Sequence, residues 1–132
     1  MAAIAHALPA DVPIPGKLPV AIVLALAGAL IGLAGVAAFR RHRTTVNPFT
    51  PERSSSVVDT GIYRFSRNPM YLGLLLGLLG WGVFLGNWVS VLLLPAFVAY
   101  MNRFQIRPEE RALTARFGPQ YLEYSRSVRR WL

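Results

Sequence analysis

The chain has 132 residues, of which 54% are hydrophobic and 15% are charged, and its formal net charge is +8. This composition departs from the averages of water-soluble domains in the direction of membrane proteins. The absence of cysteine excludes disulfides and thiolate chemistry, and with two histidines and six acidic residues we expect no metal site.

The first predicted elements are an extracytoplasmic segment over residues 1–17 and a transmembrane helix over residues 18–39. The second range carries no charge over 22 residues, and about 20 helical residues cross the hydrocarbon core of a bilayer. Three arginines follow it within residues 40–43, whereas Lys17 is the one Lys or Arg before it. Positive charge marks the cytoplasmic side, which predicts an outside N-terminus and argues against a cleaved signal peptide.

A cytoplasmic loop is predicted over residues 40–68. Its stretch from Thr44 to Ser56 is polar and contains two prolines, which indicates an irregular connector. The loop ends at Asn68 and Pro69, where asparagine can cap a helix and proline is favoured at the first helical position. The second membrane-spanning element therefore begins at Pro69.

A transmembrane hairpin is predicted over residues 69–101, within which the 32 residues from Met70 to Met101 carry no charge. Gly86 and Asn87 divide it at a turn beside the interfacial Trp88, and Pro95 is expected to kink the second limb. Both limbs are short for a bilayer. Small residues recur at the spacing that lets helix backbones approach, although glycine enrichment in membrane helices gives the same pattern: Gly28 with Gly32, and Gly73 with Gly77.

The charge distribution and the hairpin predict the same topology. Thirteen of the 14 Lys and Arg residues lie in residues 40–69 and 102–132, which a hairpin returns to one side of the membrane. We therefore predict an all-α integral membrane protein of a bacterial inner membrane, with three spans and a cytoplasmic C-terminus. The basic excess matches no groove-reading motif, so anionic lipids rather than nucleic acid are the expected partners.

The tail over residues 102–132 is predicted to be cytoplasmic and amphipathic. Pro108, Glu109 and Glu110 are typical of a helix N-terminus, where carboxylates favour the positive end of the helix dipole. Gly118 and Pro119 divide the rest of the tail into two short helices. An apolar stripe recurs at helical spacing at Leu113, Phe117, Tyr121, Tyr124, Val128 and Trp131. A basic face suited to an anionic membrane surface is formed by Arg116, Arg126, Arg129 and Arg130.

Two motifs separated by an apolar hairpin, GIYRFSRNPMYLG at residues 61–73 and EERALTARFGPQYLEYSRSVRRW at residues 109–131, resemble those of the isoprenylcysteine carboxyl methyltransferase and phospholipid methyltransferase group. Members of this group carry an Arg-His-Pro-x-Tyr-x-Gly stretch before the hairpin and paired glutamates after it. The resemblance covers residues 44–132. It implies a membrane enzyme that transfers a methyl group from S-adenosylmethionine to a lipophilic acceptor, a carboxylate or an amine.

The resemblance also implies where the cofactor binds. It gives catalytic roles to Arg67, Asn68 and Glu110, where Asn68 replaces a histidine and cannot titrate near neutral pH. Many relatives have more spans, so the pocket is less enclosed here or is completed in a homo-oligomer. The residues expected to hold the cofactor are Tyr63, Arg67, Asn68, Pro69, Tyr71, Gly73, Glu109, Glu110, Tyr121 and Tyr124.

The chemistry of the cofactor agrees with these positions. Tyrosine rings and carboxylates suit its sulfonium and amine, and Arg67 with the helix start suits its carboxylate. An amine acceptor would need Glu109 or Glu110 to accept its proton. An anionic acceptor would be bound by Arg64, Arg103 and Arg107.

Each motif also has a structural reading. Asn68 and Pro69 can be a helix cap, Glu109 and Glu110 a favourable first helical turn, and the tyrosines an interfacial belt. Two further functions stay open: a non-catalytic adaptor that binds anionic lipid, and a sterol-reductase-like enzyme that uses NADPH.

Overall fold

The computed structural model describes residues 1–7, 12–42 and 55–132, so most of the predicted connector lies outside the described residues. Within these ranges the regular structure is helical, without a β-strand, which confirms the all-α class. The elements are α1 (Ala2–Ala7), α2 (Lys17–Arg41), η2 (Gly61–Arg64), α3 (Pro69–Leu85), α4 (Trp88–Val91), α5 (Leu93–Tyr100), η3 (Met101–Ile106), α6 (Arg107–Phe117) and α7 (Pro119–Ser127).

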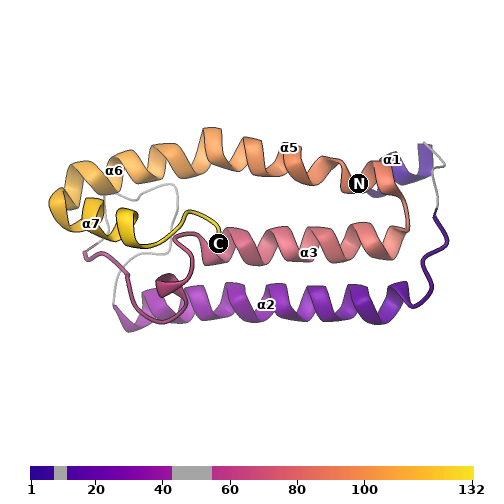
Figure 1. The fold of residues 1–132 in the computed structure, drawn as a ribbon, viewed down its shortest axis with the longest axis horizontal. Helices are drawn as coiled ribbons and strands as arrows, with labels where there is room; N and C mark the ends of the chain where they lie inside the picture. Colours follow the sequence, from indigo (N-terminus) through magenta and orange to yellow (C-terminus); the bar gives the residue numbers. More distant parts are fainter. Residues whose placement is uncertain (8–11, 43–54) are drawn as a thin grey trace.

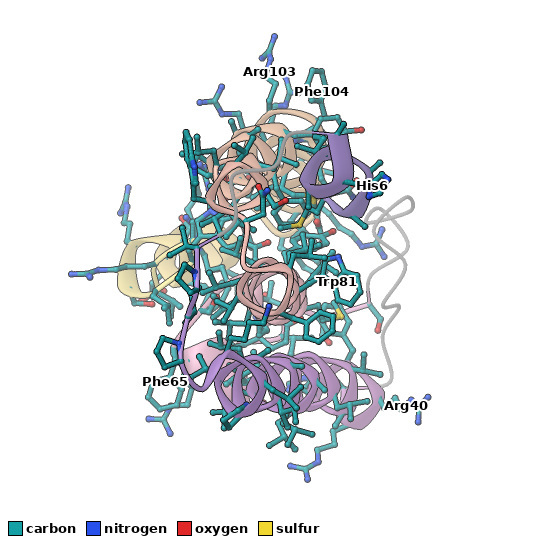
Figure 2. The ribbon with its side chains drawn as sticks, turned by 90° about the vertical axis from the view of Figure 1, so that its right-hand side faces the viewer. His6, Arg40, Phe65, Trp81, Arg103 and Phe104 are labelled. Atoms are coloured by element: carbon teal, nitrogen blue, oxygen red, sulfur yellow. The ribbon has the colours of Figure 1, made fainter. Side chains whose placement is uncertain are left out.

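The long helices lie side by side in one row. Figure 1 shows α3 between α2 and the column formed by α5 and α6, and the end-on view of Figure 2 shows the same order. Helix α7 folds back beneath α6, and the chain ends near the start of α3 (Figure 1). This arrangement brings the segment before α3, the helix α6 and the C-terminus to the same end of the molecule.

Helices α2 and α3 are in direct backbone contact. A Cβ atom on Gly73 would meet the carbonyl oxygen of Gly28 and would lie 2.9 Å from the backbone nitrogen of Gly32. One turn further along α3, a Cβ atom on Gly77 would meet nothing within 4 Å. The close-approach reading of the glycine spacing is therefore confirmed for Gly28 and Gly73.

The hairpin turns where its sequence predicts. Gly86 ends α3 with φ of 66°, a left-handed conformation that glycine adopts without strain. Asn87 then caps α4, because its side-chain oxygen accepts a hydrogen bond from the amide of Ser90 at 3.2 Å. The helix is interrupted at Leu92, just before Pro95, whose ring has no amide hydrogen for the preceding turn.

The second limb of the hairpin is longer than its charge-free run. In the described part of the chain, two helical stretches are long and apolar enough to cross a membrane, Lys17–Arg41 and Trp88–Phe117. Helix α3 is apolar but has 17 residues. The predicted boundary between residues 101 and 102 is thus not a break in the backbone, since helical structure continues through it.

The π-helical turn η3 joins α5 to α6. The amide of Arg107 donates to the carbonyl of Asn102, five residues earlier, and the wider turn accommodates Pro108, which has no amide hydrogen. Helix α6 begins at Arg107, close to the predicted start. The prediction that Glu109 and Glu110 lie at the free N-terminus of a helix is wrong, however, because the residues before Arg107 are already helical.

The apolar stripe of the tail packs into the protein. Tyr121 and Tyr124 form a buried cluster with Ala38, Val57, Val58 and Tyr63, and Leu113, Phe117 and Val128 pack against that cluster. Most of the apolar stripe is therefore buried against the rest of the protein. Its packing fixes α6 and α7 against the end of α2 and the segment before α3.

The opposite end of the hairpin contacts the N-terminal segment. The hydroxyl of the fully buried Ser90 donates to the carbonyl of Met1 at 3.2 Å. The amide of Val12 donates to the carbonyl of Gly86 at 2.7 Å. These contacts hold α1 and the start of α2 against the hairpin turn.

Candidate functional site

The two predicted motifs meet at the end of the bundle where α3 begins. Asn68 precedes Pro69, the first residue of α3, as expected. Its side chain does not cap the helix. Instead, its amide nitrogen donates to the carbonyl of Arg130 at 2.8 Å, and the backbone amide of Arg67 donates to the carbonyl of Arg129 at 3.0 Å. The C-terminal segment is thus paired with the segment before α3.

Glu110 is the centre of a charged network. One carboxylate oxygen lies 3.0 Å from Nη1 of Arg67 and accepts a hydrogen bond from Nε of Arg130 at 3.0 Å. The other accepts from Nη2 of Arg130 at 2.7 Å. The side chains of Arg67 and Glu110 are 13% and 18% exposed, so the pair is largely removed from water. The hydrogen bonds to Glu110 raise the pKa of Arg130 above its usual value.

Glu109 faces a different neighbour. Its Oε2 accepts a hydrogen bond from the hydroxyl of Tyr71 at 3.2 Å, and within the described ranges no arginine forms an ion pair with it. Successive residues of a helix are about 100° apart around its axis. The two glutamates therefore lie in different environments: Glu109 lies between α3 and α6, and Glu110 lies beside Arg67.

A cleft of about 730 Å³ lies beside Glu110, which is a usual size for a small-molecule site. Arg67 has a buried Nε atom without a hydrogen-bond partner in the described part of the chain. Burial raises the pKa of Tyr121, and Glu110 raises it further, whereas Arg67 opposes the shift. The cleft is lined by Arg67, Arg103, Arg107, Glu110, Arg111, Thr114, Ala115, Tyr121, Leu122 and Ser125.

The lining of this cleft suits S-adenosylmethionine in its chemistry. Arg67 and the arginines of α6 that line the cleft offer guanidinium groups for a carboxylate. Tyr121 and Glu110 supply an aromatic ring and a carboxylate for cationic groups. The residues present therefore fit such a cofactor.

Several of the residues predicted to contact the cofactor lie in the protein core. Tyr63 is 4% exposed and lies edge-on to Phe39, and the hydroxyl of Tyr124 donates to the Tyr63 carbonyl at 2.8 Å. Burial raises the pKa of both phenols, which keeps them neutral. Gly73 faces the backbone of α2, and Pro69 is buried on the same side. None of these residues is among those that line the cleft beside Glu110.

The predicted acceptor contacts are divided between two places. Arg103 and Arg107 line the main cleft, and Figure 2 shows Arg103 directed away from the bundle, which places it at the rim. Arg64 lines a separate cleft of about 520 Å³, together with Asp59 and Glu123. Arg64 is therefore not brought together with the other two arginines.

The sequence did not identify the C-terminal contacts of this site. The sequence pattern places Arg130 on a basic surface, whereas the structure pairs it with Glu110, 20 residues earlier in the chain. The indole nitrogen of Trp131 donates to the side-chain oxygen of Asn102 at 3.1 Å. A helical periodicity cannot indicate these contacts, because α7 ends at Ser127 and Val128 is extended.

Comparison with known proteins found a matching family and several similar sequences. A family model described as phospholipid methyltransferase matches residues 17–120. Protein-S-isoprenylcysteine O-methyltransferase A of Arabidopsis thaliana is 34% identical over 110 residues, which cover 81% of this chain and 54% of that protein. The corresponding enzyme of Schizosaccharomyces pombe is 36% identical over 72 residues, or 54% of this chain and 30% of its own length.

A shorter relative matches over its whole length. An uncharacterized protein of Haemophilus influenzae is 48% identical over 66 residues, which cover 48% of this chain and 100% of that protein. The chain spans about half the length of the Arabidopsis enzyme. No solved structure matches. Since the family model covers most of the chain, the chain belongs to the phospholipid methyltransferase family.

Proposed function

We propose that this protein is an integral membrane methyltransferase that uses S-adenosylmethionine and acts on a lipophilic acceptor. The observation that carries the proposal is the meeting of the two family motifs, through Arg67 and Glu110, at the wall of one cleft. The names of the Arabidopsis and fission yeast relatives support methyl transfer.

The residues of the cleft would bind and orient the cofactor, which supplies an electrophilic methyl group when bound. Arg67 would hold its carboxylate, and Tyr121 would face a cationic group. Glu110 would fix Arg67 by their ion pair. Methyl transfer mainly requires alignment of the acceptor with the methyl group, so rigid placement of these side chains is the main contribution.

The charge of the cleft favours an anionic acceptor over an amine. Arg67, Arg103, Arg107 and Arg111 line it. Glu110, the one acidic residue among the described residues of the lining, is already paired with two arginines. A protonated amine would be repelled there, whereas a carboxylate on a lipophilic molecule would be attracted. Methylation of a carboxylate by a sulfonium removes opposite charges, and a water-poor site favours that step.

Replacing Arg107 with glutamine tests the preference for an anion. We expect KM for a carboxylate acceptor to rise about tenfold with little change in kcat, because a rim charge contributes mainly to substrate binding. Arg126→Gln changes the net charge equally, lies outside the cleft lining, and should leave KM unchanged. Equal effects of the two variants would refute a specific role for Arg107.

We further propose three membrane spans, with α3 as the second. Its 17 residues extend about 26 Å, slightly less than a bilayer core, which local thinning accommodates. The chain has no native cysteine, so single cysteines can report topology. Cysteines at Ala3 and Trp88 should react with an impermeant reagent on intact cells, and a cysteine at Ser125 should react only after permeabilisation. Protection of position 88 in intact cells would exclude α3 as a span.

Calorimetry in detergent separates the proposed enzyme from its alternatives. We expect binding of S-adenosylmethionine and of its demethylated product S-adenosylhomocysteine, without binding of NADPH. A sterol-reductase-like enzyme would bind NADPH, and a lipid-binding adaptor would bind neither. If the folded protein binds neither S-adenosylmethionine nor S-adenosylhomocysteine, the proposed function is refuted.

A further inference from the structure

The C-terminal segment, residues 128–131, connects both walls of the site. The carbonyls of Arg129 and Arg130 accept hydrogen bonds from the segment before α3. The Arg130 side chain binds Glu110 of α6, and Trp131 donates to Asn102 of η3. The contacts of this segment therefore hold the start of α3 and the column of η3 and α6 in a fixed relation.

We propose that Arg130 is a positioning residue for the cofactor cleft, acting through Glu110; this inference rests on the proposed function. Arg130 binds both carboxylate oxygens of Glu110, at 3.0 and 2.7 Å. A two-point contact of this kind fixes the plane of the carboxylate. Arg130 is not among the residues that line the cleft, so it acts without contact to the ligand.

The consequence of this contact reaches Arg67. The Oε1 atom of Glu110, held by Arg130, lies 3.0 Å from Nη1 of Arg67. With its terminal nitrogen held there, Arg67 keeps a buried Nε without a partner in the described residues. Arg67 also lines the cleft, so the placement of its guanidinium sets where an anionic group can be bound there. Arg130 thus fixes Glu110, and Glu110 in turn fixes Arg67. Through these two contacts the C-terminal segment determines the placement of a side chain that lines the cleft.

Loss of the Arg130 side chain should affect binding more than folding. Its carbonyl would still accept from Asn68, and the core around Tyr121 and Tyr124 would keep its packing. Glu110 would keep Arg67 as a partner but would lose its two-point contact. We therefore expect a mobile Glu110, a mobile Arg67 and weaker cofactor binding in an otherwise folded protein.

A double-mutant cycle on the full-length protein in detergent tests this order. Calorimetry with S-adenosylhomocysteine compares wild type, Arg130→Gln, Arg130→Lys, Glu110→Gln and the double glutamine variant. We expect Arg130→Gln to raise Kd about tenfold, and Arg130→Lys less, because lysine keeps the charge without the two-point geometry. The double variant should bind no more weakly than Glu110→Gln alone. Arg126→Gln, which also removes one tail charge, should match wild type.

The outcomes separate this inference from the proposed function. If folded wild type binds neither S-adenosylmethionine nor S-adenosylhomocysteine, the proposed function fails and the inference with it. If wild type and Arg130→Gln bind S-adenosylhomocysteine equally well, the positioning role is refuted and the proposed function stands. The same holds if the loss of affinity in the double variant equals the sum of the losses in the two single variants. If Arg130→Gln does not fold, Arg130→Lys decides, and unchanged affinity in that variant refutes the role.

Discussion

Glu110→Gln is expected to weaken binding of S-adenosylmethionine about 100-fold, which corresponds to about 2.7 kcal/mol. Glu110 is the shared partner of Arg67 and Arg130, and its side chain is 18% exposed. Glutamine keeps the size of the side chain but leaves two arginines without a counter-charge, and loss of one member of a largely buried charge network is strongly unfavourable. Calorimetry in detergent measures the change in Kd.

Glu123→Gln is the matched control for this variant. Glu123 is an exposed carboxylate of α7 beside the second cleft, so the same chemical change there should leave the affinity within about twofold of wild type. An equal loss in both variants would attribute the effect to the net charge of the tail. Unchanged binding in Glu110→Gln would contradict the proposed role of the network.

Gly73→Ala is expected to lower the free energy of unfolding by about 3 kcal/mol, toward the upper end of overpacking effects. A methyl group at this position would meet the carbonyl of Gly28 and the amide of Gly32. Both are backbone atoms, so no rotamer change can relieve the contact, and α2 must move away from α3. Thermal and denaturant unfolding in detergent measure the loss.

Gly77→Ala provides the comparison, because a Cβ atom there meets nothing within 4 Å. Alanine is the better helix former by about 1 kcal/mol, so this variant should be as stable as wild type or slightly more stable. Similar destabilisation by both substitutions would mean that glycine matters here for a reason other than the α2–α3 contact.

Hydrophobicity and local turn chemistry predicted most of the fold. The 22-residue charge-free run appears as part of α2, Asn68 and Pro69 begin α3, and Gly86 with Asn87 form the turn. These features depend on residues close together in the chain. Apolar periodicity also found the stripe of the tail, but it could not determine which surface the stripe contacts, because that depends on packing with distant residues of α2 and of the segment before α3.

The resemblance predicted the part of the site where its two motifs meet. The resemblance assigned Arg67 and Glu110, and these residues form an ion pair across the hairpin. It also assigned Tyr63, Tyr124 and Gly73, which the structure places in packing contacts. A tyrosine or a glycine can lie either in a protein core or in a pocket, and a sequence motif does not show in which direction its side chains point.

Arg130 shows the limit of the sequence most clearly. One arginine among several in a basic tail carries no signal for a particular carboxylate, and surface charges are commonly without a fixed partner. Its contact with Glu110 depends on the extended backbone at Val128, which turns the chain back after α7. That turn follows from tertiary packing and not from local propensity.

Transfer of an isotopically labelled methyl group tests the central claim most directly. Purified protein would be incubated with methyl-labelled S-adenosylmethionine and a bacterial membrane extract, with Glu110→Gln in parallel. We predict that wild type labels a product soluble in organic solvent, that alkali releases the label because the product is a methyl ester, and that Glu110→Gln labels it far less. A folded wild-type protein that binds the cofactor but labels no lipophilic product would contradict the account.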